Sequence, residues 1–232
     1  MYTVRHTKTT LPNRRVFIKQ SVGWLALVAA TALTACQLEP SADAPTEAVS
    51  NAAPQPNAAP SFAPMSPLPL AEAAPPVALT ISAIGLAVDV APMVWEIVNT
   101  NGERSTQWRL PDGAAGWHSD SAGAGAAGNV IISGRQHGEG AVFAPLALGA
   151  VEPGQWVQLR GADDATFVYQ ITEVAEPIPL EGATPAQMAR QSTLYAVGNQ
   201  PRLTLITGWP AFTTTHRLFV TAEFRGRGAG GG

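Results

Sequence analysis

The chain has 232 residues, with 14 basic side chains, 17 acidic side chains and one cysteine. Five of the basic residues lie within the first 19 positions, so the rest of the chain has nine arginines against 17 acidic residues, a net charge of about −8. Because this acidic part carries no lysine and no basic stripe, we expect no binding to nucleic acid. A single cysteine also excludes an internal disulfide and a thiolate metal cluster.

The first 36 residues have the pattern of an export signal. Arg14 and Arg15 begin the run Arg-Arg-Val-Phe-Ile-Lys, which resembles the twin-arginine motif. An uncharged apolar stretch of 14 residues follows at 22–35, shorter than the about 20 residues of a bilayer-spanning helix. The stretch ends in Leu-Thr-Ala before Cys36, which resembles a lipobox. We therefore expect residues 1–36 to be a lipoprotein signal peptide, with lipid on Cys36 anchoring the exported protein to the outer face of the cell membrane. The alternative is a non-cleaved anchor whose cysteine is incidental.

Two segments are too poor in bulky apolar residues to form a core. Residues 37–77 are rich in Ala, Pro, Ser and Asn, and proline favours extended polyproline conformations, so we expect a disordered, semi-rigid tether. Residues 225–232 are mostly glycine, and we expect a disordered tail. The remaining stretch, 78–224, has a common size for one domain with a single core.

The sequence of 78–224 is typical of an all-β domain. Short runs of β-branched and aromatic residues recur between Gly, Pro and Asp. We expect strands at 78–83, 88–98, 129–133, 156–160, 166–174, 202–207 and 218–224. A short helix is expected at 184–190, where Thr184 is an N-cap candidate and proline follows it, and one helical turn at 142–147. The strand spacing indicates a barrel or a sandwich without deciding between them.

Several segments resemble the signatures of the sortase family. Residues 129–143, Asn-Val-Ile-Ile-Ser-Gly-Arg-Gln-His-Gly-Glu-Gly-Ala-Val-Phe, are similar to the sortase strand and loop in which Ser-Gly-His precedes a Val-Phe pair. Residues 202–210, Arg-Leu-Thr-Leu-Ile-Thr-Gly-Trp-Pro, are similar to the aliphatic-Thr-Cys signature, and 215–220, Thr-His-Arg-Leu-Phe-Val, to the strand with the family's arginine. Weaker matches at 81–85, at Trp117, which is like the entry to the family's third strand, and at 151–155 keep the order of the family. The Trp-Pro pair makes the class E/F-like sortases the most similar type.

The resemblance implies a fold and a chemistry. The fold is a closed eight-stranded sortase-type β-barrel with one or two short helices. The chemistry is cysteine transpeptidation, in which a sorting signal is cut through a thioester and passed to an amine. However, the family's cysteine falls at Gly208 and its histidine at Arg135, while its arginine is retained as Arg217. Glycine forms no acyl-enzyme and a guanidinium keeps its proton, so we do not expect ordinary sortase turnover.

Three residues near these positions are candidate substitutes. Thr207 precedes Gly208, but its hydroxyl needs a base and should point to the opposite face of the strand. His137 is either a displaced base or a solvated loop histidine. His216 is either a substitute or a structural hydrogen-bonding residue of the Thr-His-Arg run. His118 has no partner that the sequence identifies.

The charges of the matched positions suggest a ligand. If Arg135 and Arg217 face one pocket, their charge of about +2 favours an anion such as a peptide carboxylate or a phosphate. The alternative is that Glu139 folds back on Arg135 and neutralises it. We therefore expect a membrane-anchored, catalytically inactive sortase-like domain that binds a peptide or an anion in the former substrate groove. The alternative function is a sortase-type transpeptidase or hydrolase that acts on surface-protein sorting signals with a non-standard site. No cofactor or metal is expected, because no His, Asp and Glu cluster has ligand spacing.

Overall fold

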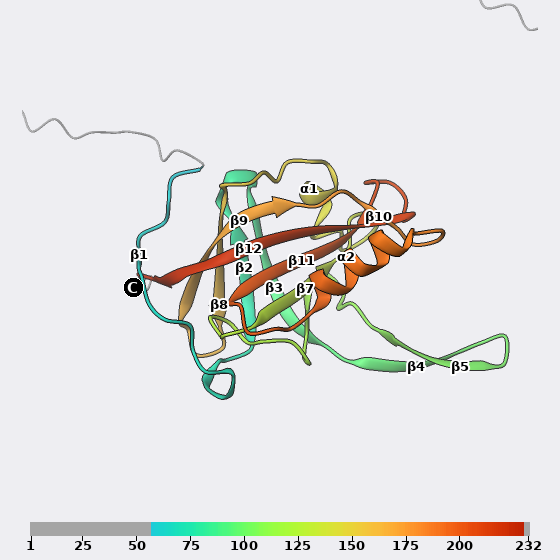
Figure 1. The fold of residues 1–232 in the computed structure, drawn as a ribbon, viewed down its shortest axis with the longest axis horizontal. Coiled ribbons are helices and arrows are strands. Elements are labelled where there is room, and N and C mark those ends of the chain that lie inside the picture. Colours follow the sequence, from blue (N-terminus) through green and yellow to red (C-terminus); the bar gives the residue numbers. More distant parts are fainter. Residues whose placement is uncertain (1–56, 230–232) are drawn as a thin grey trace, which may run out of the picture. The chain divides into compact units, whose positions relative to one another are not determined.

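The structure is a computed structural model and describes residues 57–229 (Figure 1). The export motif with Arg14 and Arg15, and the expected lipid anchor at Cys36, lie outside these residues. Within the described part of the chain, every helix is too short or too polar to span a bilayer.

Eight strands form a closed barrel. In order around the barrel they are β12 (His216–Gly228), β11 (Arg202–Trp209), β7 (Asn129–Gly134), β6 (Ala115–His118), β3 (Leu86–Met93), β2 (Pro76–Ile81), β8 (Trp156–Gly161) and β9 (Thr166–Val174). Pairing of β9 with β12 closes the barrel, and the neighbours are antiparallel except for β11 with β7 and β3 with β6. The expected closed eight-stranded β-barrel is confirmed.

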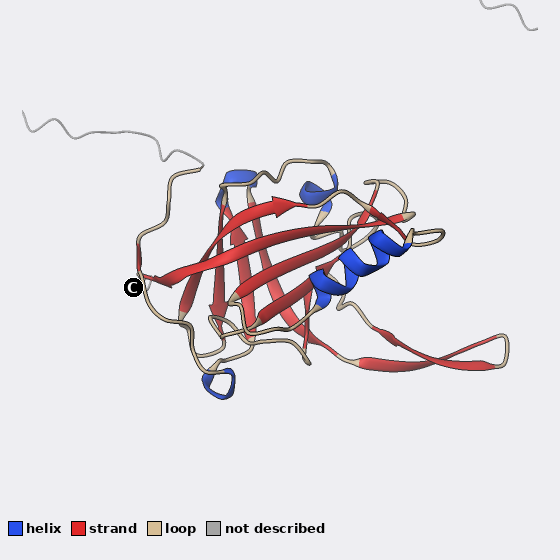
Figure 2. Ribbon diagram, in the orientation of Figure 1, coloured by secondary structure: helices blue, strands red, loops and turns tan. Residues whose placement is uncertain are grey.

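Smaller elements lie outside the barrel (Figure 2). They are β1 (Phe62–Ala63) and β10 (Ile178–Pro179), which pair with β12; the hairpin of β4 (Trp95–Thr100) and β5 (Glu103–Trp108); the helices α1 (Ala144–Ala147) and α2 (Pro185–Tyr195); and the 3-10 turns η1 (Leu70–Glu72) and η2 (Ser82–Ile84). Figure 1 shows the hairpin projecting away from the barrel. The two α-helices confirm the expectation of one or two short helices.

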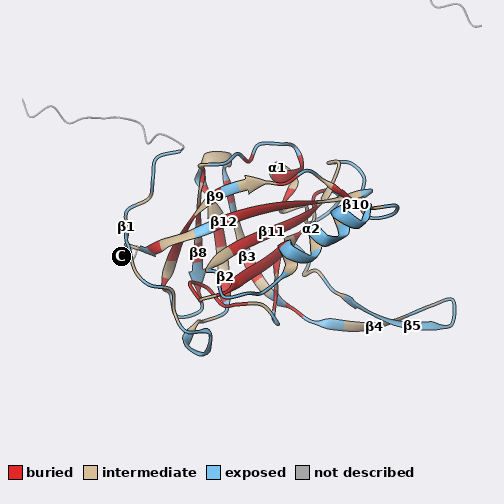
Figure 3. Cartoon of the chain, viewed as in Figure 1, coloured by how far each residue is buried: buried red, intermediate tan, exposed pale blue. Residues whose placement is uncertain are grey.

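Most residues of β7 and β11 are buried, on both faces of the barrel wall (Figure 3). Ile132 and Leu205 point into the barrel and are at most 1% exposed. Their neighbours Ile131 and Ile206 point outward and pack with Leu194 of α2 in a second apolar cluster. Alternate residues of each strand point outward, and α2 packs on some of these outward-facing side chains. Other outward-facing residues, such as Ser133, line the pocket described below.

The prediction of one strand over 88–98 is wrong about where that strand ends. β3 ends at Met93, and the chain leaves the barrel to form β4 and β5. β5 was not expected, because the run 103–107, Glu-Arg-Ser-Thr-Gln, is exposed at every position and therefore has no apolar alternation. β6 was expected only through the resemblance at Trp117, since its four residues are too few to show a period.

The domain extends beyond both expected boundaries. Phe62–Ala63 pairs with the end of β12, and the backbone N–H of Leu68 donates to the Gly125 carbonyl at 2.8 Å. Residues 62–75 therefore lie along the barrel, unlike the disordered tether expected for 37–77. Residues 225–228 belong to β12, unlike the tail expected for 225–232. The physical reason is that β12 is 13 residues long, and β1 supplies hydrogen-bond partners for its end.

Candidate functional site

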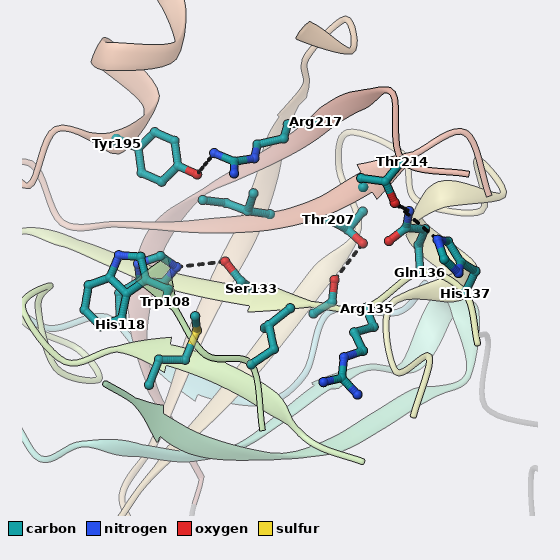
Figure 4. A pocket seen from close by; sticks show the side chains of 15 residues that line it. Trp108, His118, Ser133, Arg135, Gln136, His137, Tyr195, Thr207, Thr214 and Arg217 are labelled. Atoms are coloured by element: carbon teal, nitrogen blue, oxygen red, sulfur yellow. Dashed lines mark hydrogen bonds between the residues drawn. The ribbon is translucent and has the colours of Figure 1, made fainter. Parts of the chain in front are cut away.

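A pocket of about 420 Å³ opens where β7 and β11 end and β12 begins (Figure 4). Tyr195, the last residue of α2, lines one side of it. Met93, Trp108 and Leu110 line it from the segments that enter and leave the projecting hairpin. The pocket is therefore built from several segments that are far apart in the sequence.

The three positions matched to the sortase catalytic residues meet in this pocket. Gly208 pairs with Arg217 in the β11–β12 ladder. In the parallel β11–β7 ladder Thr207 pairs with Gly134, which places Arg135 just beyond the last pair. Arg135, Gly208 and Arg217 all line the pocket. The structure thus brings together the residues that the motifs had only suggested to be neighbours.

Arg217 offers an uncompensated positive charge. Its Nη1 donates a hydrogen bond of 3.0 Å to the hydroxyl of Tyr195. Burial raises the pKa of Tyr195, against the opposing effect of the Arg217 charge, so the phenol is neutral at physiological pH. Among the described residues, no carboxylate forms a salt bridge with Arg217. An anionic ligand would therefore meet a guanidinium whose protein partner is neutral.

Arg135 is paired, but not with the residue considered from the sequence. Its Nη1 lies 2.9 Å from Oδ1 of Asp112, in the loop between β5 and β6, and Glu139 does not take part. The two side chains are 38% and 83% exposed, so the pair contributes little to stability. Adding +1 for Arg135, −1 for Asp112 and +1 for Arg217 gives the site a formal charge of +1 rather than the expected +2.

Gln136 occupies the space beside Gly208. Its Nε2 donates to the carbonyl of Thr213 at 3.0 Å and to the hydroxyl of Thr214 at 2.6 Å, and the residue is 6% exposed. A Cβ atom at position 208 would collide with the amide group of Gln136. A side chain at 208 and the present conformation of Gln136 therefore exclude each other. Gln136 lies in the matched segment 129–143, but its role was missed because its contacts with Thr213 and Thr214 join residues far apart in the sequence.

The candidate substitutes are engaged in other contacts. Thr207 is 4% exposed, and its hydroxyl donates a hydrogen bond of 2.8 Å to the carbonyl of Gly134. A backbone carbonyl cannot act as the base that this hydroxyl would need. His137 is exposed, with Nε2 at 3.2 Å from the hydroxyl of Thr214. His216 has Nδ1 at 2.8 Å from the hydroxyl of the preceding threonine. Each of these contacts fits the structural interpretation of the residue.

His118 has a partner inside the pocket. Its Nε2 lies 2.8 Å from Oγ of Ser133, which joins β6 to β7. The residue is 5% exposed, and its ring lies 4.8 Å from that of Trp108. Burial lowers the pKa of His118 from 6.5 to about 4, against the opposing charge of Asp120 and with a further lowering by Arg217. The imidazole is therefore neutral at physiological pH. Strand alternation places Ser133 on the face of Arg135, but its pairing with His118 depends on the β6–β7 register, which the sequence does not show.

The pocket combines three chemical features. It has a guanidinium with a neutral partner, a hydroxyl in contact with a neutral imidazole, and an aromatic wall. The sole cysteine of the chain, Cys36, lies outside the described residues. Among residues 57–229, no His, Cys, Asp or Glu side chains are grouped as ligands for a metal ion. The arrangement suits anion binding and offers no thiolate at position 208.

Known proteins resemble this chain over most of the barrel. Solved structures that resemble it include the sortase D5 transpeptidase of Clostridium perfringens (17% identity, TM-score 0.46, covering 66% of this chain and 79% of that one). Others are sortase E1 of Streptomyces coelicolor with a tripeptide in the active site (18%, 0.47, 69% and 93%) and sortase A of Listeria monocytogenes (19%, 0.46, 68% and 90%). No curated protein sequence matches the chain significantly. Residues 79–225 match the family model described as the sortase domain, which is more than half of the chain, and the chain therefore belongs to the sortase family.

Proposed function

We propose that this domain has lost cysteine transpeptidation and uses the former substrate pocket to bind the carboxylate of a peptide. The observation that carries the proposal is Arg217, a pocket guanidinium whose partner is the neutral Tyr195 hydroxyl. A planar guanidinium binds a carboxylate through two parallel hydrogen bonds, and such charge-assisted bonds are among the strongest in proteins. Gly208 and Arg135 meanwhile leave the site without the nucleophile and base of the family.

The walls of the pocket favour a peptide over a small inorganic anion. Met93, Trp108, Leu110 and Ile206 give it apolar and aromatic surface, and its volume of about 420 Å³ is within the usual range for ligand sites. A phosphate would satisfy Arg217 but would leave this surface uncovered. A peptide would satisfy both, with its carboxylate on Arg217 and an apolar side chain on the wall.

We further propose that the domain acts at the outer face of the cell membrane. The support is the order of the twin-arginine pair, the apolar stretch and the lipobox that ends at Cys36. The peptide would then belong to another envelope or surface protein. In this proposal the domain holds such a partner and does not transfer it.

Calorimetric titration of the purified protein with paired tripeptides tests the binding. Each pair has an apolar last residue and differs only in carrying a free C-terminal carboxylate or an amide. We expect the carboxylate form to bind at least roughly tenfold more tightly, because a hydrogen bond to a charged group contributes about 1.5–3 kcal/mol. Arg217→Gln should remove this preference.

Arg227→Gln is the matched control, because Arg227 is an exposed arginine near the opposite end of the same strand. It should retain the preference of the unaltered protein. Equal affinity for the two forms of the peptide, or a carboxylate preference that persists in Arg217→Gln, would contradict the proposal.

A further inference from the structure

We propose that Ser133 and His118 form a serine–imidazole pair that hydrolyses activated acyl groups in the pocket. The family's sulfur and imidazole are absent from positions 208 and 135, yet a hydroxyl and an imidazole meet on the adjoining strands β7 and β6. The inference goes beyond carboxylate binding and does not rest on it, because the reacting atoms belong to neither Arg217 nor its partner. It gives the hydrolase alternative a nucleophile, Ser133, which lies in the matched segment 129–143 but was not among the candidate substitutes.

The geometry is that of a nucleophile in contact with its base. Oγ of Ser133 and Nε2 of His118 are 2.8 Å apart, and both residues line the pocket. Figure 4 shows the hydroxyl and the ring directed toward each other, with Tyr195 and Arg217 above them in the view. Hydrogen-bond contact between hydroxyl and imidazole is the arrangement that activates a serine.

The backbone holds the pair in place. The hydroxyl of Ser121 donates to the His118 carbonyl at 2.7 Å and accepts the N–H of Ile131 at 3.1 Å, so it ties the end of β6 to β7. The His118 ring is packed against Trp108 on one side, with Tyr195 at 6.3 Å. A base fixed on a barrel wall keeps its orientation without a third polar side chain.

The protonation state suits a general base. The charged groups near His118 are Asp120 and Arg217, and the facing Tyr195 is neutral. Burial outweighs the opposing charge of Asp120 and holds the pKa of His118 at about 4, so the ring is free to accept a proton at neutral pH. With its own proton on Nδ1, Nε2 accepts the hydroxyl proton of Ser133. A base with such a low pKa is weak, and we therefore expect slow turnover.

The reaction balances with water as the only co-reactant. Oγ of Ser133 attacks the carbonyl carbon of an ester or thioester while its proton passes to Nε2 of His118. Arg217 lines the same pocket and provides positive charge for the developing oxyanion. Collapse breaks the bond to the leaving group, which takes the proton from His118. Water, deprotonated by His118, then hydrolyses the acyl-serine, releases the carboxylic acid and restores the hydroxyl.

A fluorophosphonate, which phosphonylates activated serines, tests the pair in the unaltered protein. We expect one adduct by intact mass, mapped to Ser133 by peptide analysis, and none in Ser133→Ala. Ser192→Ala removes an exposed serine of α2 and should label like the unaltered protein. His118→Gln should slow labelling at pH 7 at least tenfold, because a general base contributes roughly 10²–10⁴.

The pH dependence separates catalysis from a structural hydrogen bond. The labelling rate should rise with a midpoint near pH 4 and stay level to pH 8, following deprotonation of His118. The mapping in the unaltered protein does not depend on whether any variant folds. Absence of an adduct, an adduct on another residue, or equal labelling of His118→Gln would overturn the inference. Each of these outcomes leaves the carboxylate titration unaffected, so the two proposals fail independently.

Discussion

At the scale of single residues, the buried imidazole of His118 couples the stability of the barrel to pH. Its pKa is about 4 in the folded protein and 6.5 as the ordinary value. Between pH 6.5 and 4 the unfolded chain therefore binds a proton that the folded protein does not. The free energy of unfolding falls as pH falls through this window, by roughly 3 kcal/mol in total for a difference of about 2.5 pKa units, and this contribution is constant above pH 6.5.

Thermal unfolding measured from pH 4 to 7 checks this coupling. We expect the unfolding temperature of the unaltered protein to drop across the window, and that of His118→Gln to drop less. His137→Gln is the control, because that histidine is exposed in a loop and should leave the profile unchanged. Carboxylates that titrate in the same range affect all three proteins alike. Parallel profiles for the unaltered protein and His118→Gln would show that His118 is not the coupled group.

At the scale of elements, the loop after β7 is fitted to a glycine near the end of β11. Because Gln136 fills the place of a side chain at 208, we expect Arg135→His with Gly208→Cys to restore little cleavage of a sorting-type peptide. The new cysteine would have to displace Gln136 from the carbonyl of Thr213 and the hydroxyl of Thr214, at a cost of about 1–3 kcal/mol.

Adding Gln136→Ala to the double variant should raise the cleavage rate roughly tenfold or more, since that cost is removed before the cysteine is introduced. The matched control adds Gln200→Ala instead, which replaces an exposed glutamine before β11 and should change nothing. If the double variant cleaves as fast as the triple variant, displacing the Gln136 side chain from Thr213 and Thr214 has no free-energy cost, and the prediction is wrong. The assay is the release of the cleaved peptide, followed by chromatography.

Elements long enough to show a buried face in their residue pattern follow from the sequence, and exposed or very short elements do not. The strand expected at 166–174 has the same bounds as β9, since its alternation reflects a wet and a buried face. The N-cap expected at Thr184 is present, with Gln187 completing a capping box, but α2 continues to Tyr195. β5 was missed because tertiary contacts, rather than a local pattern, hold its last residue, Trp108, against the pocket.

The candidate site also has features that the sequence predicts and features that it does not. Positions 135, 208 and 217 could be predicted, because each belongs to a segment whose order and spacing resemble one family. The contacts that give them their present properties could not. The salt bridge between Asp112 and Arg135 depends on the path of the loop that follows the hairpin. The hydrogen bond between Arg217 and Tyr195 depends on where α2 ends. Both are contacts between residues far apart in the sequence, for which local patterns carry no information.

At the scale of the whole domain, the chain enters the barrel far from the pocket. Phe62–Ala63 pairs with Gly228 and Arg227 at one end of β12, whereas the pocket lies beside Arg217 near the other end. In Figure 1, β1 and the β10 region lie at opposite ends of β12. The first described strand therefore lies at the end of β12 away from the pocket.

The same arrangement predicts that the segment before β2 stabilises the barrel. Phe62 lies 5.6 Å from the ring of Trp156, Leu68 bonds to Gly125, and the Ala74 carbonyl accepts the N–H of Ala124 at 2.9 Å. A chain that begins at 76 loses these contacts, and we expect its unfolding free energy to fall by roughly 2–4 kcal/mol relative to a chain that begins at 57. Urea unfolding measures the difference, and a chain that lacks only 230–232 is the control. Equal urea midpoints for the chains that begin at 57 and 76 would show that residues 57–75 do not stabilise the barrel. The domain would then begin at β2.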